Sequence, residues 1–328
     1  MPATGSVPGR VDPVLVIVAP GQGAQSPGFL RPWLEDPTFA NRMEWLGTVA
    51  GLDLVTHGTE SDAETIRDTA VAQPLLVAAG IVAASQLRAD EDLPAADVLA
   101  GHSVGELTAA ALGGVLSDED AMRLVAVRSR AMATAAAAEP TSMAAVVGGT
   151  REDVLAAIER HGLHPANINS AAQVVAAGSA EKIAALGEDG PAKARVIPLQ
   201  VAGAFHTPYM AAAREELAAF APTLSPADPT LPLVSNAGGE VVTSGAKYLD
   251  AIVTQVASPV DWEACMATFR DRGVTAMIEV APAGTLTGLA KRELKGIALA
   301  NLNTPDDLEA ARALVREHAG LAPSDQEA

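Results

Sequence analysis

A serine flanked by glycines is the part of the sequence best suited to covalent chemistry. Residues 101–105 read Gly-His-Ser-Val-Gly, which matches the G-x-S-x-G turn that joins a strand to a helix and pushes the serine hydroxyl outward. A short apolar stretch at 97–100 precedes the motif, and a helical pattern at 106–112 follows it. The motif therefore predicts Ser103 as a nucleophile, with the Val104 amide at the helix start placed to meet an oxyanion.

A serine hydroxyl needs a base within hydrogen-bond reach, and the chain contains six histidines. His102 adjoins the serine in a sharp turn, where neighbouring side chains diverge, so we expect it to support the turn. His206 lies in a Gly-Ala-Phe-His-Thr-Pro loop, and loops on a rigid scaffold often carry reactive groups. A capping histidine before Pro208 is the alternative, and the residues alone leave both interpretations open. No carboxylate is recognisable as the third member of a triad.

An arginine is expected on the inward face of a helix. On a helical wheel for residues 118–132, Arg128 falls in the middle of an apolar arc, whereas Arg123 and Arg130 fall on the polar side. A buried guanidinium needs an anionic partner, because an unpaired buried charge costs several kcal/mol. That arc offers no acid. The remaining partners are a substrate carboxylate or an acid from elsewhere in the chain.

Strand-like and helix-like segments alternate along the chain. Strands are expected at 14–19, 97–100 and near Leu233 and Met277, and helices at 72–87, 106–112, 117–132 and 208–220, before Ser258 and after Gly284. This alternation predicts an α/β fold with a mostly parallel sheet and helices on both faces. With the glycine-flanked serine, the expected sheet is hydrolase-like.

The middle of the chain reads as a separate unit inserted into that fold. Strands are expected at 142–147, 173–177 and 195–201, helices at 150–160 and 180–186, and a less regular strand at 166–168. Their order is close to that of a ferredoxin-like α+β unit. We therefore expect a large catalytic domain made of residues 1–138 and 202–328, and a small subdomain at 139–201.

Composition argues against several other functions. The net charge of −18 is unsuited to nucleic acid, which needs a cationic face. Cys265 is the single cysteine, so neither a disulfide nor a thiolate metal site is expected, and the pair His161 and His164 falls at a helix end. The longest apolar runs are too short to cross a bilayer, and residues 1–13 lack a signal-peptide core. We expect a cytoplasmic protein without a bound metal or a membrane partner.

Three motifs together resemble the malonyl-CoA:acyl carrier protein transacylases. They are Pro-Gly-Gln-Gly-Ala-Gln at 20–25, Gly-His-Ser-Val-Gly-Glu at 101–106 and Gly-Ala-Phe-His at 203–206, in the same order and at similar intervals. The resemblance runs from about residue 14 to residue 302. It implies malonyl-CoA as donor, an acyl carrier protein as acceptor, and no cofactor, because the coenzyme A thioester is itself the substrate.

The resemblance also implies roles for particular residues. Ser103 would carry the acyl group and His206 would act as base, with the main-chain carbonyl of Gln255 accepting the imidazole N–H. The Gln22 region would complete the oxyanion hole, and Arg128 would bind the malonyl carboxylate. For the Gln255 side chain, an exposed position at a helix end is an equally good interpretation.

Specificity and docking are less fully determined. Phe205 goes with malonyl in the resembling family, although simple core packing explains it as well. Residues 279–284 contain alanine where a Gly-Pro-Gly turn would be usual, which leaves the floor of the site near them open. Lys291, Arg292 and Lys295 form either a docking patch for an acidic carrier protein or a solvated helix face.

Two other functions remain compatible with the sequence. A serine thioesterase or esterase would pass the acyl group to water, but the missing triad acid and the inward arginine weigh against it. A catalytically silent module that only docks a carrier protein is the other rival. We expect the protein to be a monomer.

Overall fold

Two β-sheets frame the molecule in the computed structural model, which describes residues 13–89, 95–201 and 203–320. Most of the segment 1–13, in which we looked for a signal peptide, and residue 202 at the expected domain boundary lie outside these ranges. The larger sheet has the strand order β11-β10-β1-β2-β7-β8. Its neighbours are parallel except β7 and β8, which are antiparallel. The prediction of a mostly parallel sheet in an α/β fold is confirmed.

The larger unit contains the expected elements, together with α1, α2, β8, α10, β11 and α12, which were not predicted. Its strands are β1 (Leu15–Ala19), β2 (Val98–Gly101), β7 (Leu233–Val234), β8 (Val241–Val242), β10 (Ala276–Glu279) and β11 (Ala298–Asn301). Its helices are α1 (Pro37–Ala50), α2 (Leu54–Thr59), α3 (Thr69–Leu87), α4 (Gly105–Leu112), α5 (Asp118–Ala137), α8 (Ala211–Phe220), α9 (Gly245–Gln255), α10 (Trp262–Asp271), α11 (Thr285–Glu293) and α12 (Leu308–His318).

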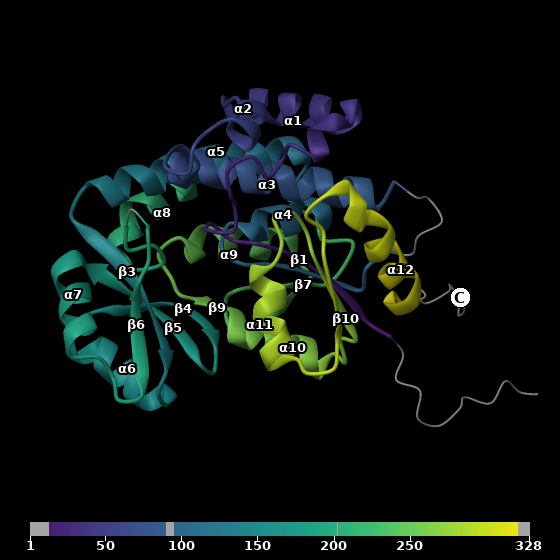
Figure 1. The fold of residues 1–328 in the computed structure, drawn as a ribbon. Helices are drawn as coiled ribbons and strands as arrows, with labels where there is room; N and C mark the ends of the chain where they lie inside the picture. Colours follow the sequence, from purple (N-terminus) through teal and green to yellow (C-terminus); the bar gives the residue numbers. More distant parts are fainter. Residues whose placement is uncertain (1–12, 90–94, 202, 321–328) are drawn as a thin grey trace, which may run out of the picture.

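Helices cover both faces of the larger sheet. Successive side chains of a strand point to opposite faces, and in β1 Leu15 and Ile17 pack with α3, α4 and α5 while Val16 and Val18 pack with α10 and α11. Figure 1 shows α1 and α2 lying outside α3 and α5, farther from the sheet. The carboxyl ends of β1 and β2 therefore open between two helical layers.

Helix α3 is apolar on all sides because it is the central helix of the core. By length and composition it is long and apolar enough to span a membrane, which our estimate from shorter apolar runs did not anticipate. However, 78% of the most apolar 18-residue segment of this helix is buried inside the protein. Protein atoms occupy the surroundings that lipid would fill, so burial in the fold accounts for the composition.

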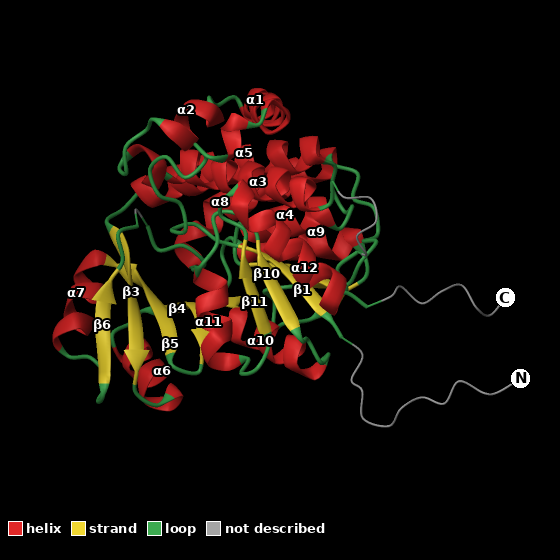
Figure 2. Cartoon of the chain, turned by 45° about the vertical axis from the view of Figure 1, so that its right-hand side comes forward, coloured by secondary structure: helices red, strands yellow, loops and turns green. Residues whose placement is uncertain are grey.

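The inserted unit forms the second sheet, seen at the left of Figure 2. Its elements in chain order are β3 (Thr141–Gly148), α6 (Arg151–Arg160), β4 (His164–Ser170), β5 (Gln173–Ser179), α7 (Ala180–Glu188) and β6 (Ala194–Pro198). Sheet order is β6-β3-β5-β4-β9. The uncertain strand at 166–168 is thus a full strand, β4.

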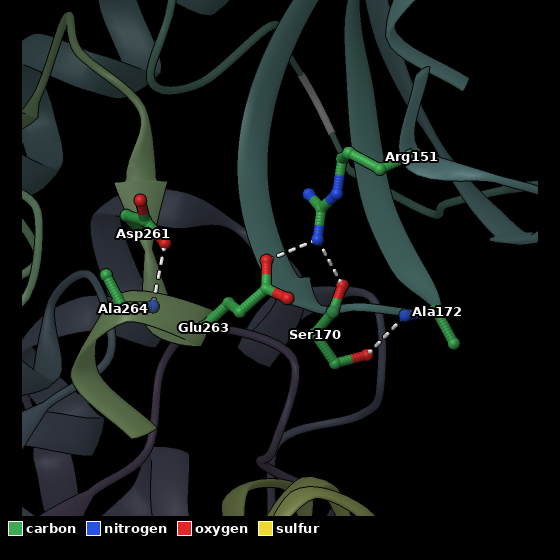
Figure 3. A network of polar contacts seen from close by, with 6 residues as sticks. All are labelled: Arg151, Ser170, Ala172, Asp261, Glu263 and Ala264. Carbon is green, nitrogen blue, oxygen red and sulfur yellow. Dashed lines mark hydrogen bonds and ion pairs between the residues drawn. The ribbon is translucent and has the colours of Figure 1, made fainter. Parts of the chain in front are cut away.

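Strand β9 (Val260–Asp261) connects the two units. It follows α9 in the chain, yet it pairs in parallel with β4 of the inserted sheet, with Asn167 opposite Val260. Arg151 at the start of α6 also forms an ion pair with Glu263 in α10 and donates to the Ser170 carbonyl at 2.8 Å (Figure 3). A segment that we assigned to the large domain therefore completes the small sheet.

Candidate active site

The turn between β2 and α4 presents Ser103 in a left-handed conformation, with φ of 54°. A Cβ atom at Gly101 would lie 2.0 Å from the Gly105 carbonyl, and one at Gly105 would lie 2.3 Å from the Ala19 carbonyl. The two flanking glycines are therefore required by close backbone contacts. A non-glycine residue at positive φ costs about 1–3 kcal/mol and persists where the surroundings enforce it, as they do here.

An imidazole lies beside the serine hydroxyl. The distance from Ser103 Oγ to His206 Nε2 is 2.8 Å, and His206 Nδ1 lies 2.8 Å from the main-chain oxygen of Gln255. A carbonyl only accepts, so Nδ1 carries the proton and Nε2 is free to accept one from the serine. Burial, followed by the nearby Arg128 charge, lowers the pKa of His206 to about 3, so the ring is neutral at neutral pH. Thr207, rather than His206, caps the 3-10 helix at Pro208, so the capping interpretation was wrong.

Arg128 is fully buried and faces the same pair. Its Nη1 donates to Gln73 Oε1 at 2.6 Å, and its Nη2 donates to Gln255 Oε1 at 2.8 Å and to Ser103 Oγ at 3.3 Å. Nε is buried without a hydrogen-bond partner. Desolvation lowers the pKa of Arg128 to about 10, which still leaves it protonated. Within the described ranges no carboxylate oxygen lies within 4.0 Å of the guanidinium, so neutral amides surround a full charge.

Two adjoining hollows lead to Ser103 and His206. The smaller, about 100 Å³, is lined by Ser103, His206, Gln22, Gln73, Met132 and Phe205. The wider one, about 330 Å³, shares Gln22 and His102 with it and extends to Arg292. We call the smaller one, which Ser103 and His206 line, the inner hollow, and the wider one the outer hollow. Residues 279–284 line neither hollow, because they form the turn into α11.

Other expected residues surround the pair without touching the reacting atoms. His102 Nε2 lies 2.9 Å from Asn169 Oδ1, its ring meets Trp262 edge-on, and burial lowers its pKa. The Gln22 side chain donates to Thr69 Oγ1 at 3.2 Å. Phe205 is 6% exposed and lines the inner hollow, so core packing and a place in the site both apply to it. Val104 is buried directly before α4.

The Gln255 side chain does more than the sequence suggested. Only 5% of the residue is exposed, so the interpretation as a solvated helix end was wrong. Its Oε1 accepts from Arg128, and its Nε2 donates to the Ser103 carbonyl at 3.1 Å and to a carboxyl oxygen of Glu106. One residue thus contacts the nucleophile's main chain, the arginine and, through its carbonyl, the imidazole.

Sequence reasoning missed three buried polar side chains. Asn236 accepts from the Ser103 amide at 2.8 Å and donates to the Gly101 carbonyl at 2.8 Å, which holds both sides of the turn. Gln73 supports Arg128, and Glu106 contacts Gln255. A polar residue within an apolar helix was the available signal for Gln73. For the 13–89, 95–201 and 203–320 ranges no group of three acidic, histidine or cysteine side chains is suited to a metal ion.

Together these features define a serine-dependent acyl transferase: a nucleophile turn, a neutral imidazole and a buried cation at the end of a parallel sheet. The profile of the acyl transferase domain matches residues 16–318, so the chain belongs to that family. The match covers both sheets and every group discussed above.

Within the acyl transferase family, the chain is similar to proteins named malonyl CoA-acyl carrier protein transacylase. The chain is 48% identical over 297 residues to the malonyl CoA-acyl carrier protein transacylase of Mycobacterium bovis, covering 90% of this chain and 98% of the relative. The crystal structure of the Mycobacterium tuberculosis enzyme superposes with a TM-score of 0.88 at 47% identity, covering 91% and 99% of the two chains. A malonyl-transacylase in complex with its type II polyketide-synthase acyl-carrier protein superposes with a TM-score of 0.86 at 28% identity, covering 92% and 99%.

Proposed function

We propose that the protein transfers the malonyl group from malonyl-CoA to the phosphopantetheine thiol of an acyl carrier protein. The observation that carries this function is the buried Arg128, whose charge is met by neutral amides and whose Nε lacks a partner, beside the Ser103–His206 pair. A substrate carboxylate supplies the direct anionic contact that the guanidinium lacks, in the fork geometry that arginine favours. The product serves fatty-acid or polyketide synthesis.

In the first half of the cycle the enzyme becomes acylated. His206 Nε2 takes the Ser103 proton as Oγ attacks the thioester carbonyl. The Val104 amide and the Gln22 region stabilise the oxyanion, each such donor contributing about 3 kcal/mol. The C–S bond breaks, and the coenzyme A sulfur leaves with the proton from His206. A malonyl ester on Ser103 remains.

The second half reverses these steps with a different thiol. The pantetheine thiol of the carrier protein enters the outer hollow and gives its proton to His206. Its sulfur attacks the ester carbonyl, the same donors stabilise the oxyanion, and Ser103 Oγ leaves with the proton. Coenzyme A departs before the carrier enters, so we propose a ping-pong mechanism, with the thioester as substrate and no resident cofactor.

The two sheets correspond to two proposed units of the chain. We propose that the large unit, 1–138 and 202–328, is a hydrolase-like catalytic domain and that 139–201 is a ferredoxin-like subdomain. The β-α-β-β-α-β order from β3 to β6 supports the second part, since a ferredoxin-like unit has that order. We further propose a cytoplasmic monomer in which the Phe205 ring crowds the substrate α-carbon and disfavours branched donors.

The adduct on the enzyme tests this function directly. Brief exposure to malonyl-CoA followed by mass spectrometry should give one malonyl group per chain, and peptide mapping should locate it on Ser103. Addition of a holo carrier protein should remove the group and load the carrier. A modified enzyme that releases free malonate rather than loading the carrier would identify a thioesterase, and an unmodified enzyme would identify a silent docking module.

The carrier protein is proposed to dock beside the outer hollow. Lys291, Arg292 and Lys295 are exposed at the end of α11 and after it, and Arg292 lines that hollow. Local basic groups attract an acidic partner even on a chain of net charge −18. The patch therefore lies where a pantetheine arm would have to enter.

Reversing two charges of this patch tests the docking proposal. We expect Lys291→Glu with Lys295→Glu to raise KM for an acidic carrier protein about fivefold, because two rim contacts contribute about 1 kcal/mol together. The acylation rate with malonyl-CoA should stay unchanged, and higher salt should reduce the difference. Lys247→Glu, an exposed lysine of α9, is the matched control. An unchanged KM for the carrier at low salt would place docking elsewhere.

A further inference from the structure

A buried carboxyl lies three residues after the nucleophile and has no part in the cycle described above. Glu106, in the first turn of α4, is 1% exposed. Its Oε1 accepts from the main-chain N–H of Asn236 at 2.8 Å, and its Oε2 accepts from Gln255 Nε2. A buried carboxylate with so few donors is costly unless a positive charge lies near it.

The Gln255 amide lies between this carboxyl and the buried guanidinium. Its oxygen accepts from Arg128 Nη2, while its nitrogen donates to Glu106 Oε2. The amide dipole is therefore aligned between a positive and a negative group, and each end is hydrogen-bonded to the group it favours. Glu106 and Arg128 also interact directly through their charges, although no contact within 4.0 Å joins them.

The other titratable groups that face Glu106 in the described structure are uncharged at neutral pH. Tyr248 of α9 and Cys265 of α10 both have a pKa well above the usual value, chiefly because they are buried and then because Glu106 is close. Arg128 of α5 is the charged group on this side. The Ser235 hydroxyl also bonds the carboxyl, and a hydroxyl can donate to the ionised form or accept from the protonated form.

We propose that Glu106 is the internal counter-charge of Arg128, coupled to it through the Gln255 amide, and that Glu106 takes up a proton from solvent when a substrate carboxylate binds the guanidinium. This inference rests on the proposed function, because it needs a carboxylate-bearing acyl group at Arg128. Glu106 is a positioning residue, since it acts on the substrate through Gln255 and Arg128.

Glu106 is expected to take up a proton because the malonyl carboxylate replaces it as the anionic partner of Arg128. Burial raises the pKa of Glu106 to about 7, against the lowering effects of its hydrogen bonds and of Arg128. A malonyl carboxylate on the guanidinium cancels the Arg128 contribution and adds a like charge nearby, both of which raise the pKa of Glu106 further. Near pH 7 the protonated fraction of the carboxyl therefore increases on binding, which takes up part of a proton from solvent.

Linkage gives the sign of the pH dependence. Because malonyl binding favours the protonated carboxyl, protonation must favour malonyl binding by the same factor. The KM for malonyl-CoA should therefore rise as pH increases through about 7, up to about tenfold for each unit by which binding shifts the pKa. In Glu106→Gln this rise should disappear, whereas a purely structural role would lower the rate equally at every pH.

Proton uptake measured with an indicator dye in weak buffer at pH 7 tests the inference. Wild-type enzyme should take up a fraction of a proton per malonyl adduct, with the adduct counted by mass spectrometry. Acetyl-CoA should give no uptake per acetyl adduct, because it releases the same thiol but carries no carboxylate. Glu106→Gln should form the malonyl adduct without uptake, and Glu119→Gln, an exposed glutamate of α5, should behave as wild type.

The outcomes separate this inference from the proposed function. Malonylation of wild type without proton uptake, or equal uptake in Glu106→Gln, overturns the role of Glu106 and leaves the transferase activity intact. Absence of any malonyl adduct on wild type overturns both. If Glu106→Gln does not fold, the comparison of malonyl-CoA with acetyl-CoA on wild type decides alone, because it needs no variant.

Discussion

Replacing His206 with alanine is expected to lower kcat/KM for malonyl transfer about 10³-fold, within the range that a positioned general base contributes. His206 Nε2 lies 2.8 Å from the Ser103 hydroxyl and is unprotonated, because Nδ1 donates to the Gln255 carbonyl. Without the imidazole the hydroxyl keeps its proton at neutral pH and is a poor nucleophile. Steady-state rates with malonyl-CoA and a holo carrier protein measure the loss.

Two companion variants make this result specific. His57→Ala should retain the wild-type rate, since His57 lies on α2, where it contacts Ser61. Ser103→Ala should form no acyl-enzyme at all, which separates loss of the base from loss of the nucleophile. A His206→Ala enzyme that acylates and deacylates at the wild-type rate would rule out this imidazole as the base.

Replacing Arg128 with alanine is expected to erase the preference for malonyl over acetyl donors, which should be about 10² or more in the wild type. An acetyl group leaves the wild-type guanidinium without an anion in direct contact, whereas a malonyl carboxylate supplies one. Malonyl transfer should therefore fall steeply in the variant, while acetyl transfer should stay the same or rise. Competition between the two donors in one reaction measures the ratio directly.

The same helix offers a control for this variant. Arg130 is exposed, so Arg130→Ala should keep the wild-type preference. Removing Arg128 also leaves Gln73 and Gln255 oxygens without their donor, so the melting temperature should fall and must be measured beside the rates. Unchanged malonyl over acetyl discrimination in a folded Arg128→Ala enzyme would exclude a carboxylate-binding role.

Much of the fold follows from local patterns. The apolar run at β1 is strongly β-branched, the run at β2 ends in glycine, and the helix caps at Ser117 and Thr150 are both observed. These signals need no knowledge of distant residues, and the elements they predict are present. Alternation of strands and helices then predicts the parallel sheet.

The short strands β8 and β9 could not be predicted in the same way. Strands β8 and β9 contain two residues each, too few for any periodicity to appear. Their strand conformation comes from partners far along the chain, which no local pattern reveals. The 3-10 turns near Trp33 and Thr65 are likewise set by packing around α1 and α2, a region for which we predicted no elements.

Residue type decided which parts of the site could be found. Ser103 has a motif, His206 is one of six histidines, and Arg128 breaks an apolar arc, so each differs from its surroundings. The carbonyl of Gln255 is a main-chain group, which every residue has, and only the resemblance to a family pointed to it. Gln73 and Asn236 act through ordinary amide side chains, whose importance depends on neighbours that the fold brings to them.

The pairing of β9 with β4 has a consequence for how the chain can be divided. Only four residues separate Gln255, whose carbonyl orients the imidazole, from the strand that the small sheet borrows. A fragment containing only residues 139–201 would lack that strand. The edge of β4 would then have unpaired main-chain groups, which favour aggregation. The small sheet is therefore completed by a strand that lies, in the chain, just after a residue of the active site.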